Sequence, residues 1–560
     1  MDFLRARKGT GFDRFDAAVL AVYAGVLAWT IHFYQPFVDE AQAWLIARDS
    51  SLPEILIRRL HYEGHPALWP MILWVAARLH LPYDGINWMG GAFALVGIYI
   101  LLRFSPFPRI FRWLLPFTFF LQYQYAAIAR PYVLFTGLLF TLCILFILRK
   151  PRPLLFGLVA GLLANISLHS AILAGMFSLL YVYELCRLRR QSPGRVAARR
   201  VAAGAGLFVL FLLCAGAVAV PAPDATVSFR PNETVVKPNA LLPNTLLMRL
   251  IPEERLPSSA PPLDAPLNPD YSSAITGQYP AIVVFAVKTI ILGISAAFYP
   301  IAKSNLLALC FIACLWLWLR SRGCARLILP FVVSCLLSVQ VFVFDHHTGM
   351  FLLSLVAAVW IALNIETDDQ MPHRRLPWIE PAFCVVALVV VALQIGWSIH
   401  CIRGVTFGSS DPGKETAAFL ESNCAGKRIA GFGFESISTE AYAQQKLFSN
   451  QPHAFWVWGV NVLPDRRRTE ALAQHPDVVV AAEVITGEEV FFNQWMKLDP
   501  LGRRTHLPMI EFWQHNGYRI THRFCGDQFR RGGVSYTFCE VILELDSAVT
   551  DAPLSTQVTP

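Results

Sequence analysis

Long apolar runs separated by short basic clusters dominate the sequence up to residue 400. A helix needs ~20 apolar residues to cross the hydrocarbon core of a bilayer, and weak alternation within these runs favours helices over the strands of a membrane barrel. We therefore predict a polytopic α-helical membrane protein with about eleven transmembrane helices. The predicted spans are 16–34, 86–104, 113–127, 132–148, 154–168, 171–186, 201–220, 304–319, 327–344, 349–364 and 379–398.

The basic clusters set the predicted orientation. Clusters such as Arg103, Arg109 and Arg112 follow alternate runs, and with a cytoplasmic N-terminus they all face the cytoplasm, as the positive-inside rule requires. All the basic clusters face the cytoplasm only if the apolar segment 281–300, which contains Lys288, does not cross the membrane. We interpret 281–300 as interfacial or re-entrant; if it crosses, the number of spans becomes twelve.

These patterns divide the chain into regions. Residues 1–400 form the transmembrane domain, and two of its connections, 35–87 and 221–303, are long outer loops. From residue 401 to 546 the composition is that of a soluble domain, which we expect outside the cytoplasm. The polar tail 547–560 is expected to be disordered.

Loop 35–87 is too amphipathic to span the membrane. Its segments 40–49, 52–60 and 66–80 are typical of helices lying at the interface, and they carry tryptophans, which favour the headgroup boundary. If segment 66–80 enters the membrane instead, the topology shifts.

The region 401–546 alternates strand and helix patterns. Lys427–Phe432 and Pro476–Val480 read as strands and Ser438–Lys446 as a helix, which indicates a small α/β domain. Cys525 and Cys539 flank a hairpin-like stretch, and an outer compartment would permit a disulfide between them. The chain has no CxxC pair, so zinc and redox motifs are not indicated.

Composition agrees with this class of protein. Hydrophobic residues make up 55% of the chain and charged residues 15%, whereas soluble domains carry about 25% charged residues. The net charge of +8 lies in the short clusters between apolar runs, which fits membrane orientation better than nucleic-acid binding.

Two adjacent carboxylates, Asp39 and Glu40, stand where the first predicted span leaves the bilayer, in a loop that also holds Glu63 and His65. Ionisable groups at a membrane boundary are costly to desolvate and often mark a functional site. Either Asp39 caps the interfacial helix, or a carboxylate is a general base that takes a proton from a hydroxyl attacking a sugar carbon. Neighbours on a helix point about 100° apart, so both need not face one site.

Basic side chains gather at the same outer helix ends. Arg130 is the leading candidate for a phosphate ligand, because guanidinium groups bind phosphate oxygens in a bidentate way; a snorkelling arginine is the alternative. His169 and the sequence Asp345-His346-His347 lie at two further ends, and Lys303 follows segment 281–300. Adjacent histidines seldom bind one ion together, and His346-His347 has no HxH or HxxxH partner that would support zinc. We therefore predict no metal ligands, while assistance by a divalent metal stays open.

Three short motifs carry a family resemblance: Asp39-Glu40, His65-Pro66-Ala67-Leu68-Trp69 and Ala129-Arg130-Pro131-Tyr132. In this order the chain resembles the GT-C glycosyltransferases that use polyprenyl-phosphate sugars, in the bacterial branch related to protein O-mannosyltransferases and lipid A aminoarabinose transferases. The resemblance covers roughly residues 10–220. It departs from the family at Ala67, where a second proline is usual, and at His346-His347, where many relatives carry an Arg-Tyr pair.

The resemblance implies that Asp39 is the catalytic base and that Arg130 contacts the donor phosphate. We expect Asp39 and Glu40 to be the catalytic residues. We expect the wider substrate-binding set to be His65, Arg130, Tyr132, His169, His346, His347 and Lys303. The predicted enzyme is an inverting hexosyl- or pentosyltransferase. It moves a sugar from a polyprenyl-phosphate carrier to an extracytoplasmic glycan, lipid or protein.

Two other classes compete with this prediction. A transporter or flippase usually places ionisable residues near the bilayer midplane, whereas here they gather at outer helix ends. A polysaccharide polymerase or ligase would use diphosphate-linked glycans instead. In each case the expected partners are membrane lipids and carrier-linked sugars rather than nucleic acid. The expected location is the bacterial inner membrane, with the N-terminus cytoplasmic and the C-terminal domain periplasmic or extracellular.

Overall fold

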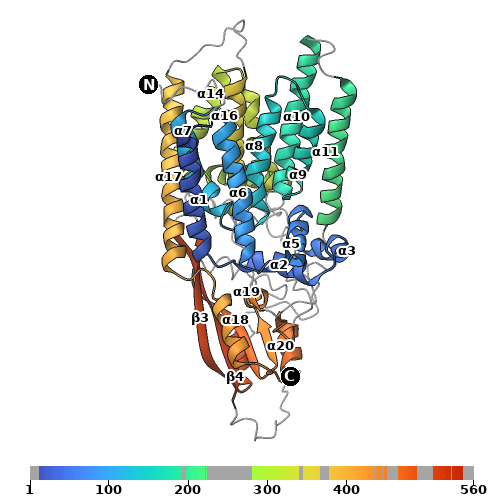
Figure 1. The fold of residues 1–560 in the computed structure, drawn as a ribbon, viewed down its shortest axis with the longest axis vertical. Helices are drawn as coiled ribbons and strands as arrows, with labels where there is room; N and C mark the ends of the chain where they lie inside the picture. The colour runs from blue at the N-terminus through green and yellow to red at the C-terminus, as the bar shows by residue number, and fades with distance from the viewer. Residues whose placement is uncertain are drawn as a thin grey trace.

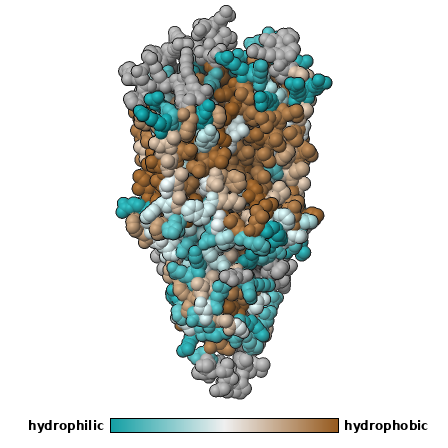
Figure 2. Space-filling view, in the orientation of Figure 1, coloured by the Kyte–Doolittle hydropathy of each residue, from teal (hydrophilic) through white to brown (hydrophobic). Residues whose placement is uncertain are grey.

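The computed structural model describes residues 12–191, 197–220, 222, 281–339, 343, 345–365, 378–433, 436–443, 445–450, 464–487, 509–530 and 533–546. Within them, a bundle of long helices stands on a smaller domain that contains a β-sheet (Figure 1). On the face in view, the space-filling picture shows a broad hydrophobic band across the bundle, bordered by more hydrophilic surface toward its far end and on the smaller domain (Figure 2). The chain is thus a multi-pass helical membrane protein with a C-terminal sheet domain.

Apolar sequence produces the bundle helices, and proline or short polar turns end them. The helices of the bundle are α1 (Arg14–Phe33), α6 (Gly85–Phe104), α7 (Arg109–Leu114), α8 (Phe135–Phe146), α9 (Pro153–Ala164), α10 (Leu168–Gln191), α11 (Ala198–Ala219), α13 (Ala281–Phe298), α14 (Asn305–Ser321), α15 (Leu329–Ser338), α16 (Asp345–Asn364) and α17 (Ile379–Phe407). Short 3₁₀ or π turns continue some of them: η3 (Leu115–Phe117), η4 (Phe120–Gln124), η5 (Pro131–Leu134) and η6 (Ala325–Ile328).

Small residues allow the closest helix contact. Gly157 of α9 and Gly204 of α11 face each other so closely that a Cβ on either would collide with the opposite backbone. Such small-residue contacts are common between helices in membranes, where no hydrophobic effect drives helices together.

Six described helices are long and apolar enough to cross a membrane: α1, α6, α10, α11, α16 and α17. Five shorter apolar helices of 10–17 residues accompany them, one of which is α5 (Leu68–Arg78) of the first outer loop. The count of eleven spans therefore stays a prediction. Segment 281–300, expected to be interfacial or re-entrant, forms the continuous helix α13, which packs against α14, α15 and α16.

Ion pairs gather at the bundle end that carries the N-terminus. Asp13 and Asp16 begin α1 with a reciprocal capping box, and Asp16 forms a fully buried ion pair of 3.0 Å with Arg112 of α7. Arg326 of η6 pairs with Glu184 near the end of α10. The start of α1, helix α7 and the end of α10 lie at the end of the bundle opposite the C-terminal domain (Figure 1).

The first outer loop folds into short helices between the bundle and the C-terminal domain (Figure 1). They are α2 (Val38–Asp49), a continuous stretch of α3 (Leu52–Glu54), η2 (Ile55–Arg59) and α4 (Leu60–Glu63), and α5 (Leu68–Arg78). On α5, Met71, Val75 and Leu79 recur every four residues and are exposed, as expected of a helix at the interface. The predicted loop 221–280 and tail 547–560 lie outside the described residues, apart from Ala222.

The C-terminal domain is an α/β fold with a mixed four-stranded sheet in the order β1-β2-β4-β3. β1 (Ile429–Phe432) and β2 (Val478–Gly487) are parallel, and β2 and β3 (Tyr518–Arg530) each pair antiparallel with β4 (Gly533–Leu545). Its helices are α18 (Gly413–Asn423), α19 (Ile437–Tyr442), α20 (Pro464–Ala473) and α22 (Met509–His515).

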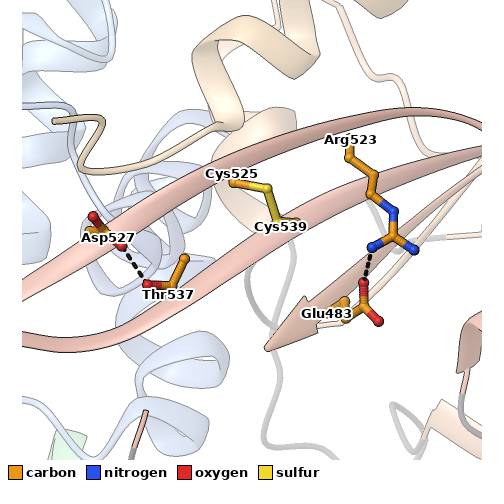
Figure 3. Close-up of a disulfide and its surroundings, with 6 residues drawn as sticks. All are labelled: Glu483, Arg523, Cys525, Asp527, Thr537 and Cys539. Carbon is orange, nitrogen blue, oxygen red and sulfur yellow. Dashed lines mark hydrogen bonds and ion pairs between the residues drawn. A yellow bond between two sulfur atoms is a disulfide. The ribbon is translucent and has the colours of Figure 1, made fainter. Parts of the chain in front are cut away.

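Covalent and polar links tie the long β3–β4 hairpin together. Cys525 and Cys539 stand opposite each other in the antiparallel register and form a disulfide (Figure 3). Nearby, Thr537 Oγ1 donates to Asp527 Oδ1 at 2.5 Å, and Arg523 reaches across β4 to Glu483 of β2 at 2.9 Å (Figure 3). The cysteine pair suggested by the sequence is therefore bonded in this structure.

Candidate active site

Asp39 and Arg130 meet at the bundle end that faces the C-terminal domain. Asp39 stands in the first turn of α2, and its Oδ2 lies 2.8 Å from Arg130 Nη1. The Asp39 side chain is 38% exposed and that of Arg130 13% exposed, so the acid faces accessible space while the arginine is largely enclosed. Sequence reasoning expected both residues at one site, and the structure brings them into contact.

The local sequence explains why Arg130 points toward α2. A residue before proline is driven out of the helical conformation, and Arg130 is extended with φ −114° and ψ 169°. Pro131 then starts η5, a position where its missing N–H costs nothing. The chain therefore breaks at Arg130 instead of continuing as a helix, which leaves the guanidinium beside Asp39.

Glu40 turns the other way and is buried, with 1% of its surface exposed. Its Oε2 accepts hydrogen bonds from Tyr34 Oη at 2.6 Å and from Phe37 N at 2.8 Å. Its Oε1 accepts from Asn87 Nδ2 at 2.8 Å and from Ala129 N at 2.6 Å. Phe37 is the N-cap residue of α2, so the carboxylate that serves the helix start is Glu40, and the alternative of capping by Asp39 is wrong.

Aromatic and imidazole rings form a row behind Arg130. The guanidinium lies 5.5 Å from the ring centre of Tyr132, and Nη1 is 3.3 Å from His346 Nε2. The rings of His346 and His347, in the first turn of α16, have centres 4.2 Å apart. His347 in turn stacks on His169 of α10, with ring centres 4.0 Å apart.

Glu63, the last residue of α4, and His65, in the loop between α4 and α5, approach the same cluster. The turn between them is made by Gly64 in a left-handed conformation with φ 63°, which glycine adopts without strain. Desolvation lowers the pKa of His65 to about 3, helped by the positive charge of Arg130. His65 is therefore neutral at physiological pH and can offer a phosphate or sugar hydrogen bonds but no charge.

Glu63 is a residue that the predicted site did not include. Desolvation raises its pKa to about 7, and the negative charge of Asp39 adds to the effect. Its Oε1 accepts a hydrogen bond of 2.5 Å from Gln42 Nε2. Gln42 follows Asp39 by three residues on α2, so both lie on one helix face. The signal in the sequence was the position of Glu63, two residues before His65.

Lys303 is not brought to the cluster. It lies exposed in the connection between α13 and α14, and within the described ranges no hydrogen bond or ion pair involves it. The side chain of Lys288 lies outside the described residues. Of the expected substrate-binding set, the structure thus gathers all members except Lys303.

The described side chains include no group of three or more His, Cys, Asp or Glu residues that could hold a metal ion. The histidine rings lie in a row, with His347 stacked on His169 and edge-to-face with His346. The chemistry that the cluster can perform with its own side chains is proton acceptance by Asp39 and binding of an anion by Arg130 and its neighbours.

An apolar groove lies within the bundle. It lies between α7, η3, η4, α14, α16 and α17. Residues such as Leu115, Phe120, Val359 and Phe383 line it. Phe120, one of the lining residues, packs on Tyr125 with ring centres 5.7 Å apart, and Tyr125 packs on Tyr132 at 5.4 Å. One aromatic ring therefore separates the groove from the Arg130 cluster.

Comparisons with known proteins give little similarity. No protein-family model matches the chain, and no curated protein matches it in sequence. Among solved structures, the chain is similar to the cryo-EM structure of the arabinofuranosyltransferase AftD from Mycobacteria, with 14% identity and a TM-score of 0.35. The alignment covers 97% of this chain and 40% of that protein.

Proposed function

We propose that this protein is an inverting glycosyltransferase that moves one sugar from a polyprenyl-monophosphate carrier to an acceptor hydroxyl outside the cytoplasm. The observation that carries the proposal is the contact of 2.8 Å between an accessible carboxylate, Asp39, and a largely enclosed guanidinium, Arg130. Glycosyl transfer needs both a base for the acceptor and a cation for the leaving phosphate.

In the proposed reaction, Asp39 accepts the proton of the acceptor hydroxyl while the hydroxyl oxygen attacks the anomeric carbon. A new C–O bond forms on one face as the bond to the phosphate oxygen breaks on the other, so the anomeric configuration inverts. The phosphate leaves with the electron pair, and Arg130 stabilises its charge. Neutral His65 and the histidine row are suited to hydrogen-bond the phosphate oxygens or the sugar.

The apolar groove supports a lipid-linked donor. An isoprenoid chain has no polar atoms to satisfy, and the groove is lined almost entirely by apolar side chains of four bundle helices and their connecting turns. A chain lying in it would bring its phosphate head to the end near Tyr125 and Tyr132, beside Arg130.

Two features support an extracytoplasmic site. Basic residues gather at the opposite end of the bundle, as the positive-inside rule predicts for a cytoplasmic end. The C-terminal domain, on the site side, contains the Cys525–Cys539 disulfide, and disulfides persist in oxidising compartments such as the periplasm.

The test is a donor panel with purified full-length protein in lipid nanodiscs. Undecaprenyl-monophosphate pentoses and hexoses are compared with the same sugars on undecaprenyl diphosphate, with cell-envelope extract as acceptor. We expect release of undecaprenyl phosphate and a product of inverted anomeric configuration from a monophosphate donor. Turnover only of diphosphate-linked glycans would identify a polymerase or ligase, and vesicle translocation of the carrier without sugar transfer would identify a flippase.

A further inference from the structure

The buried acid next to the proposed base has a geometry of its own. Asp39 and Glu40 are neighbours in α2, and the residues they bind, Arg130 and Ala129, are neighbours in the connection between η4 and η5. The Asp39 carboxylate contacts the Arg130 guanidinium, while the Glu40 carboxylate accepts the Ala129 backbone N–H. Two consecutive acids of one segment thus hold two consecutive residues of the other.

Each of the four donors to Glu40 comes from a different place in the fold. Tyr34 ends α1, Phe37 begins α2, Asn87 lies on α6, and Ala129 precedes Arg130. Asn87 Nδ2 also donates to Ala127 O at 2.8 Å, which ties the same connection to α6 a second time. The carboxylate therefore joins the segment that bears Asp39 to the segment that bears Arg130.

We propose that Glu40 is a positioning residue that sets the distance between Asp39 and Arg130, and that it takes no proton in the reaction. This inference rests on the proposed glycosyl transfer. Glu40 is enclosed by protein, so substrate cannot reach it. Its two oxygens face N–H and O–H donors, and an acceptor-only carboxylate matches that set.

Glutamine tests this requirement because it keeps the size of the side chain. Whichever way the amide is turned, its NH₂ group faces at least one N–H donor that cannot accept: Phe37 N–H on one side, or Asn87 NH₂ and Ala129 N–H on the other. The side chain must shift, and the link between Asp39 and Arg130 loosens. Misplacement of a catalytic group by about 1 Å can cost about 100-fold in rate.

The experiment uses full-length protein in nanodiscs, with undecaprenyl-phosphoryl arabinose or mannose as donor, whichever the wild type turns over. We expect Glu40→Gln to lower kcat by about 100-fold, while the Kd for undecaprenyl phosphate rises by less than about tenfold. In the Asp39→Asn background, Glu40→Gln should lower kcat by no more than about threefold, because the base that Glu40 positions is already absent. Asp49→Asn, a matched acid at the other end of α2 that pairs with Arg48, should leave kcat unchanged.

Tyr34→Phe gives a milder version of the same test, since it removes one donor and leaves the carboxylate with three. If Glu40→Gln does not accumulate as folded protein, kcat is measured for Tyr34→Phe with and without Asp39→Asn. Tyr34→Phe should lower kcat only when Asp39 is present.

The possible outcomes separate the two proposals. A wild type that turns over no carrier-linked sugar refutes the proposed function and this inference with it. An active wild type with Glu40→Gln within about threefold in kcat refutes the inference alone. If Glu40→Gln lowers kcat equally with and without Asp39, the inference is also refuted, because Glu40 would then act only on overall folding.

Discussion

Arg130→Lys is the sharpest test of how the donor is held. The change keeps the positive charge but replaces a planar fork of five N–H donors by a single ammonium group. In the structure the guanidinium spans Asp39 and His346, with contacts of 2.8 Å and 3.3 Å, and lies over the ring of Tyr132. An ammonium group cannot reproduce this planar arrangement and also bind two phosphate oxygens.

The size of the expected effect follows from the bonds lost. A hydrogen bond to a charged group contributes about 1.5–3 kcal/mol, and the lysine variant loses one such bond to the phosphate. At 1.4 kcal/mol for each factor of ten, the Kd for the carrier phosphate should rise by about 10- to 150-fold. The loss in kcat/KM should be at least as large, because charge on the phosphate grows as the glycosidic bond breaks.

The assay measures binding of undecaprenyl phosphate to the protein in nanodiscs, together with kcat/KM for the donor. Arg78→Lys is the matched control: Arg78 also lies over an aromatic ring, Trp74 at 5.3 Å, and bonds two backbone carbonyls, Arg48 O and Ser50 O. That variant should bind the carrier as the wild type does. If Arg130→Lys also binds within about threefold of wild type, Arg130 is not the phosphate ligand and its contact with Asp39 is only structural.

Three further predictions concern the same site. Asp39→Asn should lower kcat by ~10²–10⁴-fold, the usual contribution of a general base, with little change in undecaprenyl phosphate affinity; turnover close to wild type would remove Asp39 from the mechanism. The raised pKa of Glu63, about 7, means that Glu63 is neutral below that pH and ionised above it. Its negative charge should then oppose phosphate binding, so the KM for the phosphodiester donor should rise as the pH passes through about 7, and Glu63→Gln should abolish that dependence. Val359→Trp places a large ring from α16 in the groove. It should raise the KM several-fold for a long-chain donor and leave the KM for a short-chain donor unchanged. Leu213→Trp, on the exposed face of α11, should change neither KM.

Much of this arrangement could be predicted because local sequence determines it. The length of apolar runs predicts the bundle, and the amphipathic segments 40–49, 52–60 and 66–80 correspond to α2, the α3–α4 stretch and α5. The break at Arg130-Pro131 follows from proline chemistry. A helical periodicity of about 100° per residue already implied that Asp39 and Glu40 point in different directions.

Contacts between distant segments could not be predicted in the same way. His346 lies 216 residues from Arg130 in sequence, and no local pattern determines which helix end of the bundle it will face. Which acid serves the start of α2 was also undetermined, because Asp39 and Glu40 are both suitable until the donors around Glu40 are known. Glu63 was not in the predicted set because a lone acid on a loop is usually solvated, and only the folded loop brings it beside Asp39.

The C-terminal domain participates in the site through α2. One apolar cluster unites Val38 and Trp44 of α2 with Trp69 of α5 and with Ile437 and Phe538 of the domain. Polar contacts reinforce it, since the Arg48 guanidinium donates to the Glu440 and Ala443 carbonyls at 3.3 Å each. Because α2 is buried on both sides, without the domain it would expose apolar residues to water and lose one of the two surfaces that fix its position. The helix that carries Asp39 thus depends on residues nearly 400 positions later in the chain, which gives the domain a structural role in the site.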